Sequence, residues 1–207
     1  MKRRPFNFES TDLERDCARL LQLLYASKVM RERIIESYDD ASDQDKAAKD
    51  RNSGLLLYLF RGEEADANRT LMNLAIVVRS GFEAIPIDSE SDRLCSLCYT
   101  FDGDDEELEA LGYPNSPKHL FHALEKRGDK PELFGIRQTC NKIIHATNVE
   151  WQTARVKKGN ALSDLKADEY IEPWLWLGSN WKLKTKQKKW ACYVNVEAFC
   201  LNTLGLY

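Results

Sequence analysis

Apolar residues recur at three- and four-residue steps through the N-terminal part of the chain, and this spacing limits its possible folds more than any other feature. The stripe from Thr11 to about Ser37 is typical of one face of an α-helix. Its members are Leu13, Cys17, Leu20, Leu21, Leu24, Val29, Ile34 and Ile35. A second helix is expected from near Asp43 to Phe60, and a third from near Ala65 to Gly81. Successive amphipathic helices favour a helical bundle.

Further helices are expected before residue 150. Ser116 and Pro117 suit the N-cap and the first turn of a helix that starts there. A longer helix is expected from about Pro131 to Thr147, and a short one around Asp92–Tyr99.

The pattern changes after residue 150. Pro173–Asn180 and Trp190–Val196 are rich in aromatic and β-branched residues and predict two strands, and Glu197–Leu206 predicts a short final helix. The expected fold is therefore mainly α. Residues 1–150 would form the helical bundle, and residues 151–207 a small C-terminal antiparallel β-hairpin appendage with a terminal helix, packed on the bundle.

Charge and hydropathy exclude several classes of protein. Residues 151–207 carry 9 basic and 5 acidic residues, whereas residues 1–150 carry 21 and 28, so a polyanion is expected to bind near the C-terminal third. Every apolar run is far shorter than the roughly 20 residues of a membrane-spanning helix. Glu9, Asp12 and Glu14 occupy the region where a secretory signal would be apolar. We expect a cytoplasmic protein that makes no membrane contact, with its six cysteines reduced.

Arg137, Asn141 and His145 form the most informative motif, because they lie at successive four-residue steps of an expected helix. Arginine grips phosphate oxygens and histidine titrates near neutral pH, so this ridge could hold a phosphodiester and move protons. The alternative is structural. His145 would then interact with carbonyls at the helix end, and Arg137 would pair with a carboxylate.

This motif in its helical context resembles the HEPN superfamily of helical-bundle proteins, many of which are metal-independent ribonucleases or components of toxin and antiphage systems. The usual family signature has four to six residues between arginine and histidine, whereas seven separate Arg137 from His145. The resemblance implies that His145 is a general acid or base and that Arg137 stabilises charge on the phosphate. It also implies that Asn141 orients one of these groups and that Lys142 adds positive charge. No cofactor would be needed, and the site would form in a homodimer or a larger assembly with partner proteins.

A lysine-rich segment follows the first expected strand. If it is extended, Lys182, Lys184, Lys186 and Lys188 project from one face and could follow an RNA backbone. The alternative is that these lysines protect an exposed β edge. The nearby Trp174, Trp176, Trp181 and Trp190 are expected to be core residues or anchors for a partner protein.

Two pairs of residues have the internal spacing of zinc ligands. They are Cys95 with Cys98 and His119 with His122, which together could complete a tetrahedral site. Their apolar neighbours make packed helices the favoured interpretation, so no metal site is expected.

The sequence favours an RNA-binding protein and leaves open whether it is a metal-independent endoribonuclease of a toxin or antiphage system. The competing hypothesis is a non-catalytic interaction module that docks to a partner through its Trp-rich C-terminal region.

Overall fold

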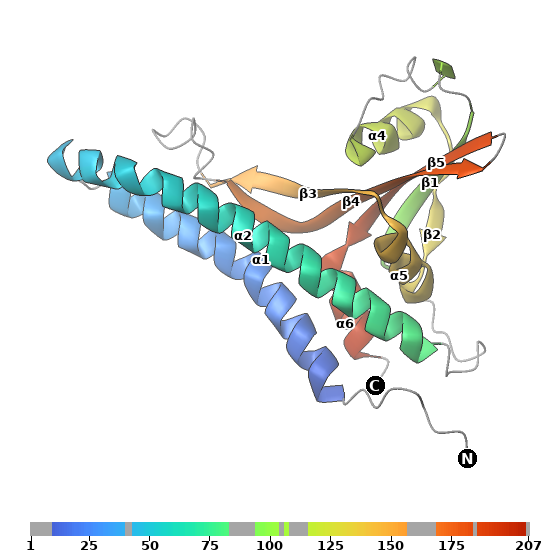
Figure 1. The fold of residues 1–207 in the computed structure, drawn as a ribbon, viewed down its shortest axis with the longest axis horizontal. Coiled ribbons are helices and arrows are strands. Elements are labelled where there is room, and N and C mark those ends of the chain that lie inside the picture. Colours follow the sequence, from blue (N-terminus) through green and yellow to red (C-terminus); the bar gives the residue numbers. More distant parts are fainter. Residues whose placement is uncertain are drawn as a thin grey trace.

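The computed structural model describes residues 10–39, 43–82, 94–103, 106–107, 116–156, 169–183 and 186–205. Its helices are α1 (Ser10–Asp39), α2 (Asp43–Phe82), α4 (Pro117–Arg127), α5 (Ile136–His145) and α6 (Val196–Leu204) (Figure 1). Its strands are β1 (Ser96–Asp102), β2 (Glu132–Phe134), β3 (Asn148–Arg155), β4 (Glu169–Leu183) and β5 (Lys186–Asn195).

An antiparallel sheet of five strands, in the order β2-β1-β5-β4-β3, lies at the centre of the fold. The expectation of a mainly α protein with a small hairpin appendage is therefore wrong. The expected boundary between residues 150 and 151 falls inside β3, and strands from both sides of it pair in the one sheet.

The expected helix around Asp92–Tyr99 is also wrong, because Ser96–Asp102 forms β1. Ser96 and Cys98 are buried on one side of this strand, and Tyr99 and Phe101 on the other. A strand that is covered on both faces has no polar-apolar alternation, and a short run of this kind cannot be told from a helix by its period.

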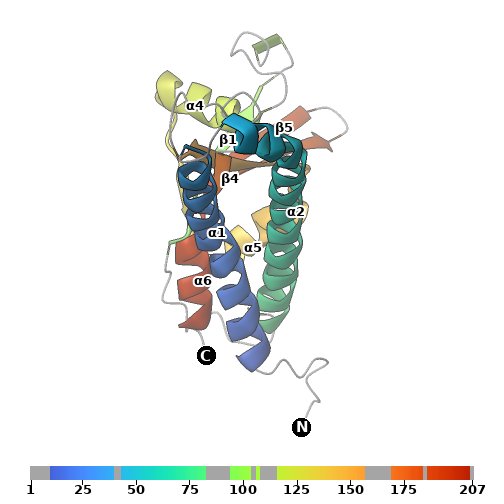
Figure 2. The same ribbon diagram turned by 90° about the vertical axis from the view of Figure 1, so that its left-hand side faces the viewer.

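Two long helices, α1 and α2, run side by side in opposite directions across one face of the sheet (Figures 1 and 2). The second and third expected helices are one continuous helix, α2. Leu20, Leu24, Leu71 and Leu74 are buried there in a core that also contains α5 and α6 residues. Apolar burial of this kind stabilises helices more than local propensity does.

The opposite face of the sheet is covered by α4, which packs on Tyr99, Phe101 and Trp176 (Figure 1). The expected start of α4 is confirmed, since the Ser116 side chain caps the helix by accepting a hydrogen bond from the His119 amide. Helix and sheet approach closely at Gly178, where an added Cβ would lie 3.0 Å from Cβ of Pro117. The space for α4 therefore depends on a residue without a side chain.

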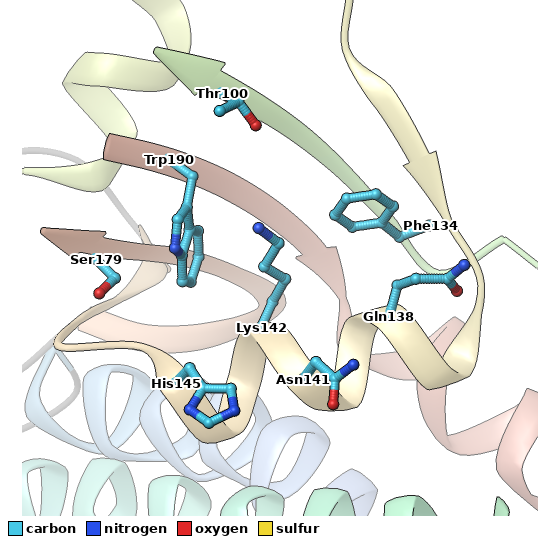
Figure 3. Close-up of a pocket in the computed structure, with 8 residues that line it drawn as sticks. All are labelled: Thr100, Phe134, Gln138, Asn141, Lys142, His145, Ser179 and Trp190. Atoms are coloured by element: carbon cyan, nitrogen blue, oxygen red, sulfur yellow. The ribbon is translucent and has the colours of Figure 1, made fainter. Parts of the chain in front are cut away.

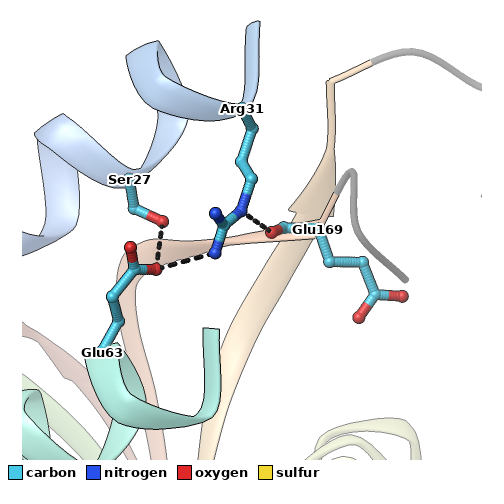
Figure 4. Close-up of polar contacts among 4 residues, drawn as sticks. All are labelled: Ser27, Arg31, Glu63 and Glu169. Atoms are coloured by element: carbon cyan, nitrogen blue, oxygen red, sulfur yellow. Dashed lines mark hydrogen bonds and ion pairs between the residues drawn. The ribbon is translucent and has the colours of Figure 1, made fainter. Parts of the chain in front are cut away.

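A buried ion pair joins α1, α2 and β4 (Figure 4). The Arg31 guanidinium donates from Nη2 to the Glu63 carboxylate at 3.1 Å and from Nε to the Glu169 carbonyl at 3.2 Å. Ser27 donates to the same Glu63 oxygen at 2.9 Å. This cluster fixes the position of the helical pair at the start of β4.

Among the described helices, none combines the length and the apolar character that crossing a bilayer requires.

Candidate functional site

Helix α5 has one buried face and one polar face. It begins after Gly135 and buries Ile136, Thr139, Cys140 and Ile143. The part of the expected helix that precedes it is strand β2. Residues 138, 141, 142 and 145 follow three- and four-residue steps, so they share the face opposite the buried one. A polar ridge therefore runs along α5, and two of the three motif residues, Asn141 and His145, belong to it.

This ridge forms one wall of a pocket of about 370 Å³ between α5 and the sheet (Figure 3). The pocket is lined by Thr100, Phe134, Gln138, Asn141, Lys142, His145, Ser179 and Trp190. Its volume falls in the range of about 300–1,000 Å³ that is usual for small-molecule sites. The pocket thus brings together three of the proposed RNA-site residues, Asn141, Lys142 and His145, with Trp190.

Lys142 extends from α5 toward the strands, between two aromatic side chains (Figure 3). Its Nζ lies 4.3 Å from the centroid of the Trp190 ring and 5.4 Å from that of Phe134. Both distances allow cation–π attraction, which is worth about 0.5–2 kcal/mol depending on exposure. The ammonium is therefore held inside the pocket by the rings.

A pair of thiols lies behind this ammonium. Cys98 and Cys192 are opposite each other on β1 and β5, and both are fully buried. The hydrogen bond with Cys192 and the charge of Lys142 lower the pKa of Cys98, although burial opposes them. Burial raises the pKa of Cys192. All six cysteines of the chain are buried free thiols.

Asn141 receives a hydrogen bond from a residue that the sequence analysis did not single out. Nε of Arg79, on α2, donates to Oδ1 of Asn141 at 2.7 Å. The two residues are 62 positions apart, and no local pattern in the sequence links them. A guanidinium therefore lies beside the motif, but it comes from another helix than the motif predicted.

His145 is the last residue of α5, and its side chain is exposed. Its ring lines the pocket (Figure 3) and makes no hydrogen bond to another described residue. The imidazole is thus available to a ligand, which the acid–base hypothesis requires.

Arg137 lies outside the set of residues that line the pocket. It lies about 40° around the helix from Asn141, on the side away from Gln138 and Lys142. Its side chain is half-buried, and no ion pair joins it to another described residue. Lys142 and Arg79 are the cations that the fold brings to the ridge instead.

The lysine-rich hairpin continues from the rim of the pocket. Ser179 and Trp190 line the pocket and pair with each other, and the next pairs along β4 and β5 lead into the hairpin. Lys184 lies outside the described residues, and only the backbone is described at Lys182, Lys186 and Lys188. The expectation that these lysines project from one face is wrong: Lys182 pairs with Gln187 and Leu183 with Lys186, so strand alternation places Lys182 on the opposite face of the hairpin from Lys186 and Lys188. The pairing of Ser179 with Trp190 places the hairpin next to the pocket.

The four residues considered as zinc ligands do not converge. Cys98 belongs to the core on the α5 side of the sheet, whereas His122 packs against Trp176 on the α4 side. No group of three or more potential ligands gathers among the described residues.

The tryptophans of the C-terminal part are mainly core residues. Trp176 and Trp190 are buried, and Trp174 stacks on Tyr193 with 4.9 Å between ring centroids. The side chain of Trp181 lies outside the described part of the chain.

Comparison with protein-family models, with curated proteins and with solved structures gave no significant match for this chain. The resemblance to the HEPN superfamily therefore stays a prediction.

Proposed function

We propose that this protein binds single-stranded RNA in the pocket beside α5 and cleaves it there without a metal ion. One observation carries the proposal: an exposed imidazole, His145, and an ammonium held by aromatic rings, Lys142, line the same pocket. Further support comes from the adjoining hairpin, because Lys182, Lys184, Lys186 and Lys188 lie within seven residues of sequence and no acidic residue interrupts them.

The chemistry assigned to these groups is transesterification. His145 accepts the proton of the ribose 2′-hydroxyl, and the 2′-oxygen then attacks phosphorus. The bond from phosphorus to the 5′-oxygen breaks, and this oxygen takes a proton from water. Lys142 stabilises the additional negative charge on the phosphate oxygens in the transition state. The products are a 2′,3′-cyclic phosphate and a 5′-hydroxyl.

The role assigned to Arg137 from the HEPN resemblance passes to Lys142 in this proposal. The homodimer or partner assembly and the toxin or antiphage context belong to the same proposal and derive from that resemblance. The cytoplasmic location also belongs to the proposal, and it derives from the short apolar runs and the acidic residues near the N-terminus. The interaction-module alternative is less favoured, because burial of Trp176 and Trp190 leaves little of either side chain for a partner.

Cleavage of a labelled single-stranded RNA in EDTA tests the proposal. His145→Ala should slow cleavage by about 100-fold or more, the usual contribution of a general acid or base. His119→Ala is the matched control, because His119 is an exposed histidine on α4, outside the pocket, and its loss should leave the rate unchanged. Equal rates for the two variants would refute the assignment of His145, and wild-type protein that neither binds nor cleaves RNA would refute the function.

A further inference from the structure

The contact between Arg79 and Asn141 fixes the orientation of an amide in the pocket wall. A guanidinium carries only hydrogen-bond donors, so the amide atom that faces it must be the oxygen. The usual ambiguity between the oxygen and the nitrogen of an asparagine is thereby removed. Figure 3 shows the Asn141 nitrogen on the side of the strands and its oxygen on the opposite side.

The pocket consequently presents donors around one point of the ridge. The amide nitrogen of Asn141 carries two N–H groups, and the neighbouring Lys142 carries an ammonium. No acidic residue is among the described residues that line the pocket. Donors with a positive charge and no carboxylate are the surroundings that a phosphate group requires.

Arg79 also strengthens the donor that it orients. A hydrogen bond from a cation to the amide oxygen polarises the amide and makes its N–H groups better donors. Arg79 therefore acts on a ligand through Asn141.

We infer that Asn141 donates hydrogen bonds to the phosphate group of the ligand and that Arg79 is the positioning residue for this donor. The inference deepens the proposed function, and it rests on that function for the statement that the bound phosphate belongs to RNA. In a purely structural role, by contrast, the hydrogen bond from Arg79 to Asn141 would only hold α2 against α5.

The substitution Asn141→Asp separates these two roles. A carboxylate still accepts from Arg79, as an ion pair, so the tie between the helices is kept or strengthened. It has no N–H group, so the donor to phosphate is lost. Gln138→Glu is the matched control, because it adds the same charge to the same wall of the pocket, one turn earlier on α5.

The experiment is a titration of the full chain with inorganic phosphate, with adenosine 5′-monophosphate and with a short RNA. The readouts are the affinity by calorimetry and the side-chain amide resonances of Asn141 by NMR, assigned by their loss in Asn141→Asp. Phosphate should shift these resonances in the wild type. Asn141→Asp should weaken phosphate binding about tenfold or more, as expected for a lost hydrogen bond to a charged group, with a melting temperature no lower than wild type. Gln138→Glu should weaken it clearly less, and Arg79→Met should give a loss between the two.

The inference would be overturned if phosphate left the Asn141 side-chain amide resonances of the wild type unshifted. It would also be overturned if the wild type and Asn141→Asp bound phosphate with equal affinity. An effect of Gln138→Glu as large as that of Asn141→Asp would do the same, since charge alone would then explain both. A response to RNA without any to phosphate or to the mononucleotide would also contradict it. Phosphate binding that depends on Asn141, in a protein that leaves RNA intact, would refute the proposed cleavage and keep the inference.

Discussion

Replacing one partner of the buried pair Arg31–Glu63 should destabilise the protein far more than replacing both. The Arg31 side chain is 0% exposed and Glu63 is 17% exposed, so neither charge is well solvated when its partner is lost. Glu63→Leu leaves the guanidinium buried, with its hydrogen bond to the Glu169 carbonyl but no counter-charge from Glu63. Breaking a buried pair in this way costs about 3–5 kcal/mol of unfolding free energy.

Arg31→Met should cost less than Glu63→Leu. The remaining carboxylate keeps its hydrogen bond from Ser27 and part of its solvent contact, so we expect a loss of about 1–3 kcal/mol. The double variant buries no charge from this pair, and apolar replacements of a buried pair are often neutral. We therefore expect it to lie within about 1 kcal/mol of wild type, which gives a coupling energy of several kcal/mol.

Urea unfolding followed by circular dichroism measures the four free energies of this cycle. Arg15→Met is the control on the same helix, because Arg15 pairs with Asp12 at 2.9 Å while their side chains are 68% and 50% exposed. An exposed pair contributes less than about 1 kcal/mol. Additive effects of Arg31→Met and Glu63→Leu would refute the reasoning, since they would show that the two charges do not depend on each other.

Three further predictions concern the stability of the fold. Burial raises the pKa of Cys140 from 9.0 to about 12, so between these pH values the folded protein keeps the thiol proton while the unfolded chain releases it. The unfolding free energy should therefore fall as pH rises from 9 toward 12. In Cys140→Ala, urea unfolding at several pH values should show a smaller fall of the unfolding free energy with pH. Gly178→Ala should destabilise the protein by about 1–3 kcal/mol, because the added methyl group would press against Pro117. Thermal unfolding measures this loss, and an unchanged melting temperature would mean that α4 shifts to make room. Ser116→Ala should cost about 1 kcal/mol, because the amide of His119 loses its cap, and Ser116→Thr should restore most of it in the same assay.

The parts of the fold that the sequence predicted are those with local signals. The cap at Ser116 and the apolar faces of α1 and α5 depend on residues within one or two helical turns. The strands β4 and β5 were predicted because their aromatic and β-branched residues are bounded by turn signals.

What the sequence could not predict depends on contacts between distant segments. Thr100 reaches the pocket because β1 pairs with β5 in a register that places it opposite Trp190. Arg79 reaches Asn141 because α2 packs against α5. Neither register nor helix packing leaves a periodic trace in one sequence, so the ridge on α5 was predictable and the opposite wall of its pocket was not.

The path of the chain around α5 has a mechanical consequence. This helix follows β2 and precedes β3, which are the two outer strands of the sheet. Gly135 on one side and Ala146 with Thr147 on the other are the short tethers that connect it to both margins. A ligand that displaces or stabilises α5 would therefore affect both edge strands together. Amide exchange at β2 and β3 would then change together, although three strands separate them.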